Sequence, residues 1–419
     1  MAKEDYEVVI GLEVHAELST KTKIFCSCPT DFGAAPNTQT CPICMAMPGT
    51  LPVLNEKVIE YAVKAGIATE CTIARDSKND RKNYFYPDLP KSYQISQFDK
   101  PLCEHGKIEI ETANGTKIIG ITRIHIEEDS GKLNHDIFGG GTLVDLNRAG
   151  VPLIEIVSEP DLRTVEEVEQ YLKKLKSILE YIEVSDCKMQ EGSFRADVNV
   201  SVRKIGETKF GTRTEMKNMS SFRNITRAIE YEVDRQIDVI ENGGKITQET
   251  LRWDEVSGKT FPMRDKEDAQ DYRYFPEPDL VAIKLSEEYI ENINNTLPEL
   301  PEKRKQRYLD EYKLSNKDAN IITSSKYLSD LFEGAIAICN NPKAVNNWII
   351  SDISRIINET EIEPSQIPFD CKQLAKLVML IDKGTISSSI GKKVLVELFE
   401  EPRDPEEIIK EKGWMQISD

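Results

Sequence analysis

Runs of alternating apolar and polar residues dominate the first 294 residues of the chain. Residues 11–18 and 193–203 alternate with the two-residue period of a strand that has one buried face and one open face. Gly, Pro, Asn and Asp separate such runs and indicate turns. This pattern predicts a mainly antiparallel sheet whose apolar face is covered by other elements.

Two helical patterns interrupt the strands. Thr164 and Glu167 form a capping-box pattern, after which apolar residues recur at steps of three and four as far as Ile182. A second pattern begins after Ser221 and stops at Gly243, which suits a helix C-terminus. Because each helix has one apolar stripe, we expect both to cover the sheet. Residues 1–294 are therefore predicted to form an α+β domain.

The pattern changes at NTLPELPEKR, residues 295–304, which contains two prolines. Beyond it, amphipathic helical patterns follow one another with almost no strand pattern between them. We therefore predict an all-α helical domain over residues 295–410. Residues 411–419 show no obvious final element, and we expect them to be the start of a tail domain that is otherwise absent.

Four of the nine cysteines lie close together, at Cys26, Cys28, Cys41 and Cys44. Two closely spaced thiol pairs joined by a polar loop can supply four thiolates to one tetrahedral Zn²⁺. Four sulfur ligands leave no open position for a substrate, so the predicted zinc site at 26–44 is structural. The alternative is a set of unligated thiols or a redox pair.

Composition narrows the classes of protein that the chain can belong to. The chain has 419 residues and a formal net charge of −18, which is not the balance of a general nucleic-acid binder. No stretch approaches the ~18 consecutive apolar residues of a membrane span, so we expect no membrane partner. The N-terminus carries acidic residues where a signal peptide would be basic. We expect a cytoplasmic protein with reduced thiols.

The polar faces of several predicted strands carry charges that could perform chemistry. They combine carboxylates, a histidine and fixed cations, namely Glu13, His15, Glu155, Arg195, Asp197, Glu215 and Lys217. A solvated outer sheet face is the alternative for any one strand. The combination favours a site for Mg²⁺ and phosphate groups, because Mg²⁺ prefers oxygen ligands and phosphoryl transfer needs cations around the transferred group. Alternation alone does not decide between Glu127 and Glu128 in RIHIEED.

Two other segments could contact nucleotides or RNA. Residues 80–97 combine three cations with aromatic residues, a pattern that can stack on bases and contact phosphates, or simply form a packed loop. Residues 303–307 place four cations at the start of the helical domain, as a solvated helix face or an RNA backbone contact. The chain contains no GxxxxGK[ST], GxGxxG, GxSxG or HExxH motif, so these signals do not point to the common nucleotide or hydrolase sites.

Several long and unusual segments together resemble the B subunit of the tRNA-dependent amidotransferases. They are VIGLEVHAEL, DRKNYFYPDLPKSYQISQFD, RIHIEEDSGK, LVDLNRAGVPLIEIVSEPDLR, GSFRADVNVSVR, DYRYFPEPDL and MQISD. The resemblance implies a cradle-shaped domain, a helical domain and a small tail. It also implies a heterotrimer in which the partners are an amidase, the A subunit, and a small C subunit. With the tail absent, we expect weaker tRNA binding.

The resemblance also implies roles for individual residues. Mg²⁺-binding carboxylates are expected at Glu13, Glu128, Glu155 and Glu215, with His15 beside them and with Asp197 or Glu127 as further candidates. Lys82, Arg195 and Lys217 are expected to contact phosphates.

The reaction implied is ATP-dependent phosphorylation of the side-chain carboxylate of glutamyl-tRNA(Gln), aspartyl-tRNA(Asn) or both. Amidation follows, with ammonia supplied by the partner amidase. Two alternatives stay open at this point: a non-catalytic tRNA-binding scaffold, and activation by adenylation.

Overall fold

The computed structural model describes residues 2–135, 139–217, 219–263, 271–360 and 362–415. The chain divides into two compact units, Met1–Pro298 and Glu299–Asp419. The first combines a large sheet with helices, and the second is helical in the residues described, so the predicted α+β class is confirmed.

A nine-stranded sheet forms the centre of the first unit. Its order is β14-β13-β12-β11-β1-β10-β7-β6-β2, and all neighbours are antiparallel except β12 and β13. The strands are β1 (Tyr6–Glu17), β2 (Thr72–Ile73), β6 (Cys103–Thr112), β7 (Gly115–Glu128), β10 (Pro152–Ser158), β11 (Phe194–Lys204), β12 (Thr214–Lys217), β13 (Thr250–Asp254) and β14 (Lys259–Pro262).

Strand register aligns polar residues from distant segments in rows across this sheet. Glu155 on β10 stands opposite His15 on one side and His125 on the other. His15 in turn stands opposite Arg195 on β11. In neighbouring rows Glu13 pairs with Asp197, and Asn199 pairs with Glu215. Residues that are far apart in sequence therefore share one face.

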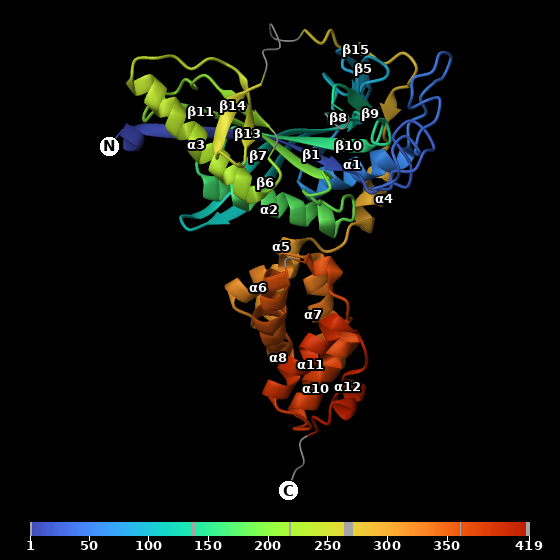
Figure 1. Cartoon of the computed structure of the whole chain (residues 1–419), viewed down its shortest axis with the longest axis vertical. Helices are drawn as coiled ribbons and strands as arrows, with labels where there is room; N and C mark the ends of the chain where they lie inside the picture. Colours follow the sequence, from blue (N-terminus) through green and yellow to red (C-terminus); the bar gives the residue numbers. More distant parts are fainter. Residues whose placement is uncertain (1, 136–138, 218, 264–270, 361, 416–419) are drawn as a thin grey trace. The chain divides into compact units, whose positions relative to one another are not determined.

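Three helices pack against the sheet and beside one another: α1 (Glu56–Ala68), α2 (Val165–Tyr181) and α3 (Phe222–Glu241) (Figure 1). The apolar partners of the alternating strands, such as Leu12, Val14 and Ala196, are buried. Helix α2 begins as predicted, with Thr164 Oγ1 accepting a hydrogen bond from the Glu167 N–H at 3.1 Å. The Glu167 carboxylate accepts from the N–H of Arg163, one residue before the cap.

Smaller elements complete the first unit. A three-stranded sheet, β15-β4-β5, is made of β15 (Phe275–Pro276), β4 (Asp80–Asn83) and β5 (Tyr93–Ser96). It joins residues 80–96 to a segment almost two hundred residues later. The remaining elements are η1 (Ala2–Asp5), the pair β3 (Asp76–Ser77) and β16 (Ile283–Lys284), the pair β8 (Lys132–His135) and β9 (Thr142–Asp145), and helix α4 (Glu287–Thr296).

The second unit consists of short helices around a core that includes Tyr308, Phe332 and Leu374. They are α5 (Pro301–Glu311), α6 (Asn316–Thr323), α7 (Lys326–Cys339), α8 (Pro342–Asn347), η2 (Trp348–Ile353), α9 (Ser354–Thr360), η3 (Pro364–Gln366), α10 (Cys371–Asp382), α11 (Ser388–Glu400) and α12 (Pro405–Glu411). Of the predicted tail segment 411–419, residues 416–419 lie outside the described part of the chain.

The basic run on α5 is largely neutralised within its own unit. Arg307 forms ion pairs with Glu299 and Glu333, and Arg304 pairs with Asp330 at 2.9 Å. Lys305 is buried. These contacts favour a structural role for the run over the RNA contact considered from sequence.

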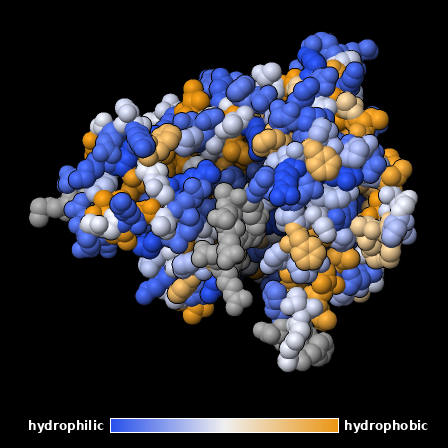
Figure 2. Space-filling model, turned by 90° about the horizontal axis from the view of Figure 1, so that it is seen from above, coloured by the Kyte–Doolittle hydropathy of each residue, from blue (hydrophilic) through white to orange (hydrophobic). Residues whose placement is uncertain are grey.

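The surface agrees with the strongly charged composition. The face seen in Figure 2 is mostly hydrophilic, and its apolar residues form separate groups. Within the described residues, no helix combines the length and apolar character that crossing a bilayer requires.

The cap of α2 provides a local test of the helix start. Replacing Thr164 with Ala removes the hydroxyl acceptor, and we expect a cost of about 1 kcal/mol to the first turn. Hydrogen exchange of the peptide covering residues 163–172 should then be faster than in the wild type. Thr164→Ser keeps the hydroxyl and serves as the control. Equal exchange in the alanine and serine variants would show that the cap does not hold this turn.

Candidate active site and metal centre

The polar face of the large sheet carries two imidazoles and two carboxylates in mutual contact. His15 Nε2 lies 3.3 Å from Glu127 Oε1 and 3.4 Å from Glu155 Oε2. His125 Nε2 lies 3.3 Å from the same Glu155 oxygen and 3.8 Å from Glu127 Oε2. These four residues come from β1, β7 and β10, and the register described above brings them together.

The opposite charges of the two histidines and the two glutamates determine which of these side chains are protonated. Burial disfavours protonation of both imidazoles, but contacts with Glu127 and Glu155 outweigh it and raise the pKa of His15 and of His125. Burial likewise disfavours ionisation of the two carboxyl groups, yet the histidines lower the pKa of Glu127 and of Glu155. Without a metal ion the cluster therefore keeps both carboxylates ionised, the form that binds a cation, whereas His15 must lose its imidazole proton before Nε2 can bind one.

Three of these residues have the arrangement of a metal-binding group. One ligand atom each from His15, Glu127 and Glu155 lie within 4.8 Å of one another. Two carboxylates suit a hard divalent cation such as Mg²⁺, which commonly completes its coordination with waters or phosphate oxygens. The donors present therefore fit the cation expected from sequence.

A second charged group continues the same face over β1, β11 and β12. Lys217 Nζ lies 2.7 Å from Asp197 Oδ2 and 2.9 Å from Glu215 Oε1. The Asn199 side-chain amide donates to Glu13 Oε1 at 3.0 Å. Burial, together with the nearby carboxylates of Glu155 and Glu215, raises the pKa of Glu13. Glu13 therefore lies between the two groups, and carboxylates of both groups affect the pKa of its carboxyl group.

Two further cations stand beside these carboxylates. The Lys82 ammonium lies 4.8 Å from the centre of the Tyr272 ring. Burial opposes its charge, but Glu127 and the neighbouring tyrosines raise the pKa of Lys82. Arg195 pairs with Asp129 at 2.9 Å. Both side chains therefore carry positive charge at neutral pH.

Glu128 is not part of this group. Its carboxylate binds the Lys91 ammonium, with Lys91 Nζ 2.5 Å from Oε2, and accepts from the Ile95 N–H at 2.8 Å. Successive residues of a strand point to opposite faces, so only one of Glu127 and Glu128 can join His15. The geometry brings Glu127 to His15, and the expectation that Glu128 is a metal ligand finds no support in these contacts.

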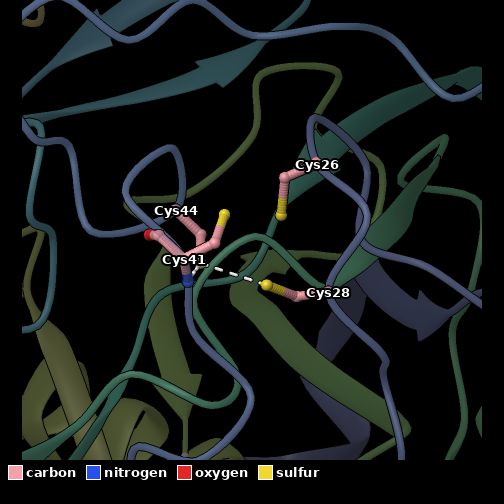
Figure 3. A group of neighbouring side chains, drawn as sticks. All are labelled: Cys26, Cys28, Cys41 and Cys44. Atoms are coloured by element: carbon pink, nitrogen blue, oxygen red, sulfur yellow. Dashed lines mark hydrogen bonds between the residues drawn. The ribbon is translucent and has the colours of Figure 1, made fainter.

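The four clustered cysteines converge as the sequence predicted. Their sulfurs point toward one another from two loops (Figure 3), and all four lie within 4.8 Å of one another. Cys44 Sγ is 3.9 Å from Cys41 Sγ and 4.0 Å from Cys28 Sγ. The set is compatible with a structural zinc ion, which takes four thiolates in tetrahedral geometry.

Sequence reasoning missed the contribution of residues 272–277 to the site. The Asn83 N–H donates to the Tyr272 carbonyl at 2.9 Å, and strand β15 pairs with β4. This pairing brings the Tyr272 ring beside the Lys82 ammonium. It also places Glu277 Oε2 2.7 Å from Arg81 Nε, as an ion pair. Both segments are rich in aromatic residues, but the periodicity of a sequence cannot show that two strands so far apart are paired.

Comparisons with known proteins define the class of the chain. Residues 8–291 match the GatB/GatE catalytic domain family, and residues 330–419 match the GatB domain family. The polar sheet face thus lies within a domain of a catalytic class.

Similar full-length proteins narrow the class further. The chain is 60% identical over 418 residues to the B subunit of the aspartyl/glutamyl-tRNA(Asn/Gln) amidotransferase of Caldicellulosiruptor bescii, covering 99% of this chain and 87% of that protein. The protein of that name from Thermoanaerobacter pseudethanolicus is 60% identical over 413 residues, and that from Brevibacillus brevis is 55% identical over 414, with the same two coverages. The chain belongs to the B-subunit family of these amidotransferases.

The ion pair between half-buried Lys91 and buried Glu128 yields a stability prediction. Lys91→Met should destabilise the protein by about 3 kcal/mol, because it leaves the Glu128 carboxylate buried without its cation. The double variant Lys91→Met/Glu128→Gln should recover most of that loss. Urea denaturation of the two variants and the wild type measures both effects. A single variant as stable as the wild type would mean that Glu128 does not depend on Lys91.

Proposed function

We propose that the polar sheet face of this chain catalyses the ATP-dependent phosphorylation of a side-chain carboxylate on glutamyl-tRNA(Gln), aspartyl-tRNA(Asn) or both. Ammonia from a partner amidase, the A subunit, then converts the acyl phosphate to the amide. The observation that carries the proposal is the cluster of His15, Glu127 and Glu155 beside half-buried cations.

The cluster supplies the residues that would hold Mg²⁺. Glu127, Glu155 and His15 are the inner candidates, and Glu13, Asp197 and Glu215 extend the carboxylate surface along the same sheet face. When bound, Mg²⁺ supplies positive charge to the phosphate oxygens of ATP. Within this proposal Glu127 replaces Glu128 in the ligand set.

The cations of the face suit the negative charge of a phosphoryl group. Lys82, Arg195 and Lys217 are all held in place by neighbouring groups rather than free in solvent. Because these cations are already fixed, little free energy is spent on moving them when negative charge develops during phosphoryl transfer. We assign them to orienting the triphosphate and to stabilising the transferred group.

The first chemical step needs no general base from the protein. The substrate carboxylate is already ionised at neutral pH, so its oxygen attacks the γ-phosphorus directly and ADP leaves. The acyl phosphate is electrophilic, and attack by ammonia expels inorganic phosphate. Ammonia reacts only when unprotonated, which favours its delivery from the partner over uptake from bulk water.

The main alternative is a scaffold that binds tRNA without chemistry. Such a surface needs exposed cations that are free to pair with RNA phosphates. The cations on the sheet face are instead partnered by carboxylates of this chain, as at Lys217 with Asp197 and Arg195 with Asp129. A face on which carboxylates lie among the cations suits a triphosphate that binds together with a divalent cation, because the carboxylates can hold that cation.

The remaining parts of the proposal concern assembly. We propose a cytoplasmic heterotrimer in which this chain joins the amidase A subunit and a small C subunit, and which acts on misacylated tRNA. We further propose that Cys26, Cys28, Cys41 and Cys44 bind structural zinc, supported by the convergence of their sulfurs.

Adjacent glutamates allow a matched test of the metal ligands. Glu127→Gln should weaken binding of Mn²⁺, used as a Mg²⁺ analogue, by about tenfold or more, because it removes one charged ligand. Glu128→Gln makes the same chemical change one residue away and should leave Mn²⁺ affinity nearly unaltered. Isothermal titration of Mn²⁺ into each variant measures the difference. The opposite ranking would restore Glu128 as the ligand.

Nucleotide products test the reaction itself. With the reconstituted complex, ATP, Mg²⁺ and glutamyl-tRNA(Gln), we expect ADP and phosphate to be released only in the presence of charged tRNA. Glu155→Ala should reduce this release by at least about a hundredfold, because it removes a carboxylate from the proposed metal site.

Two outcomes of this experiment would contradict the proposal. Undiminished turnover in Glu155→Ala would move the chemistry away from this face and support the scaffold alternative. Release of AMP and pyrophosphate would show that activation proceeds by adenylation.

A further inference from the structure

A single lysine is fully buried beside the cysteine cluster. Lys23 has 0% of its surface exposed. Its ammonium donates to the Leu146 carbonyl oxygen at 3.2 Å and to Cys44 Sγ at 3.6 Å. No step of the proposed reaction uses this residue, and its sequence context did not single it out.

The backbone around Lys23 fixes where its side chain lies. The Lys23 N–H donates to the Cys28 carbonyl at 2.9 Å, which ties it to the loop that carries the first cysteine pair. The next residue, Ile24, donates to the Gly150 carbonyl at 2.9 Å. Gly150 lies against both the Lys23 stem and Cys44. The ammonium is thereby directed to the sulfur cluster by two separate segments of the chain.

A buried ammonium requires negative charge nearby. Its transfer from water costs several kcal/mol unless an anion or strong acceptors compensate. Within the described residues, no carboxylate forms an ion pair with Lys23. A cavity of about 230 Å³ is lined by Lys23 and by two carboxylates, Glu128 and Asp279, but Glu128 pairs with Lys91 and Asp279 pairs with Arg81. The ammonium contacts the Leu146 carbonyl oxygen and Cys44 Sγ, and of these two groups only the sulfur can carry a compensating negative charge, as a thiolate.

We propose that Lys23 is a positioning residue of the four-cysteine centre, which compensates the charge of its thiolates and fixes Cys44. The proposal rests on the zinc assignment made above. Four thiolates and one Zn²⁺ carry two net negative charges, which one ammonium reduces to one. A hydrogen bond to a metal-bound ligand also orients that ligand.

The sign of the effect on zinc affinity follows from charge balance. Zinc binding displaces protons from thiols, and the four thiolates formed carry more charge than Zn²⁺ brings. The centre therefore becomes more negative when zinc binds. A fixed positive charge beside it favours the bound state, so its loss should weaken zinc binding.

Substitution of Lys23 in the full chain tests this role. Lys23→Met should lower zinc affinity by about tenfold or more, as removal of outer contacts to metal ligands typically does. Lys23→Arg keeps the charge and should stay close to the wild type. Lys23→Gln keeps a hydrogen-bond donor without charge and should weaken binding like the methionine variant. It also provides a second neutral variant if Lys23→Met does not fold.

Lys305 offers a matched control, because it is a buried lysine in the second unit. Lys305→Met should leave zinc affinity unchanged. Affinity is measured by competition with a chromophoric chelator, and the charge-transfer absorption of the Co²⁺-substituted protein reports whether four thiolates still bind. The zinc-dependent rise in melting temperature should shrink in Lys23→Met, whereas a purely structural lysine would lower the melting temperature equally with and without zinc.

Two results would overturn the proposal, and they are distinguishable. Wild-type zinc affinity in both Lys23→Met and Lys23→Gln would remove the role of Lys23 while keeping the zinc site. A wild-type protein that binds no zinc would remove the zinc assignment itself, and the role of Lys23 with it. Neither result would alter the proposed carboxylate chemistry on the sheet face.

Discussion

The polar sheet face depends on one constraint: the strand register must place each buried charged residue beside a residue of opposite charge. Glu155 is flanked by His15 and His125 because β1, β10 and β7 pair in one specific register. A shift of one residue would turn these charges into the apolar layer under the helices and place Ile154 or Ile156 on the open face. The apolar core and the polar cluster therefore specify the same register, and the sheet holds its ionised groups in place before any ligand binds.

Local patterns were sufficient for what is decided within one strand or helix. Alternation predicted that Glu13 and His15 share a face, and the capping pattern located the start of α2 at Thr164. Other features depend on pairing between distant strands. The contact of Glu127, rather than Glu128, with His15 depends on how β7 meets β10 and β5. The position of Tyr272 over Lys82 depends on the pairing of β15 with β4. The burial of Lys23 could not be predicted, because the sequence around one lysine in a polar loop does not differ from that around a solvated lysine.

The first unit has two charged centres, the polar sheet face and the cysteine cluster, and their charges are compensated in different ways. On the sheet face, carboxylates and cations lie side by side, and fixed charges of both signs surround the place where we propose that ATP binds. At the cysteine cluster, four sulfurs converge beside a buried ammonium, and a zinc ion bound by all four would have no open coordination position for a substrate. The first arrangement suits catalysis, and the second suits support of the loops around it.

We propose that His15 and its carboxylate neighbours hold a metal ion together with ATP. Pulsed electron paramagnetic resonance of Mn²⁺ bound to the chain in the presence of ATP tests this directly. We expect a nitrogen coupling from an imidazole and a phosphorus coupling from ATP in the same complex, with the nitrogen coupling lost in His15→Gln. A phosphorus coupling without any nitrogen coupling, or a nitrogen coupling that survives in His15→Gln, would contradict it.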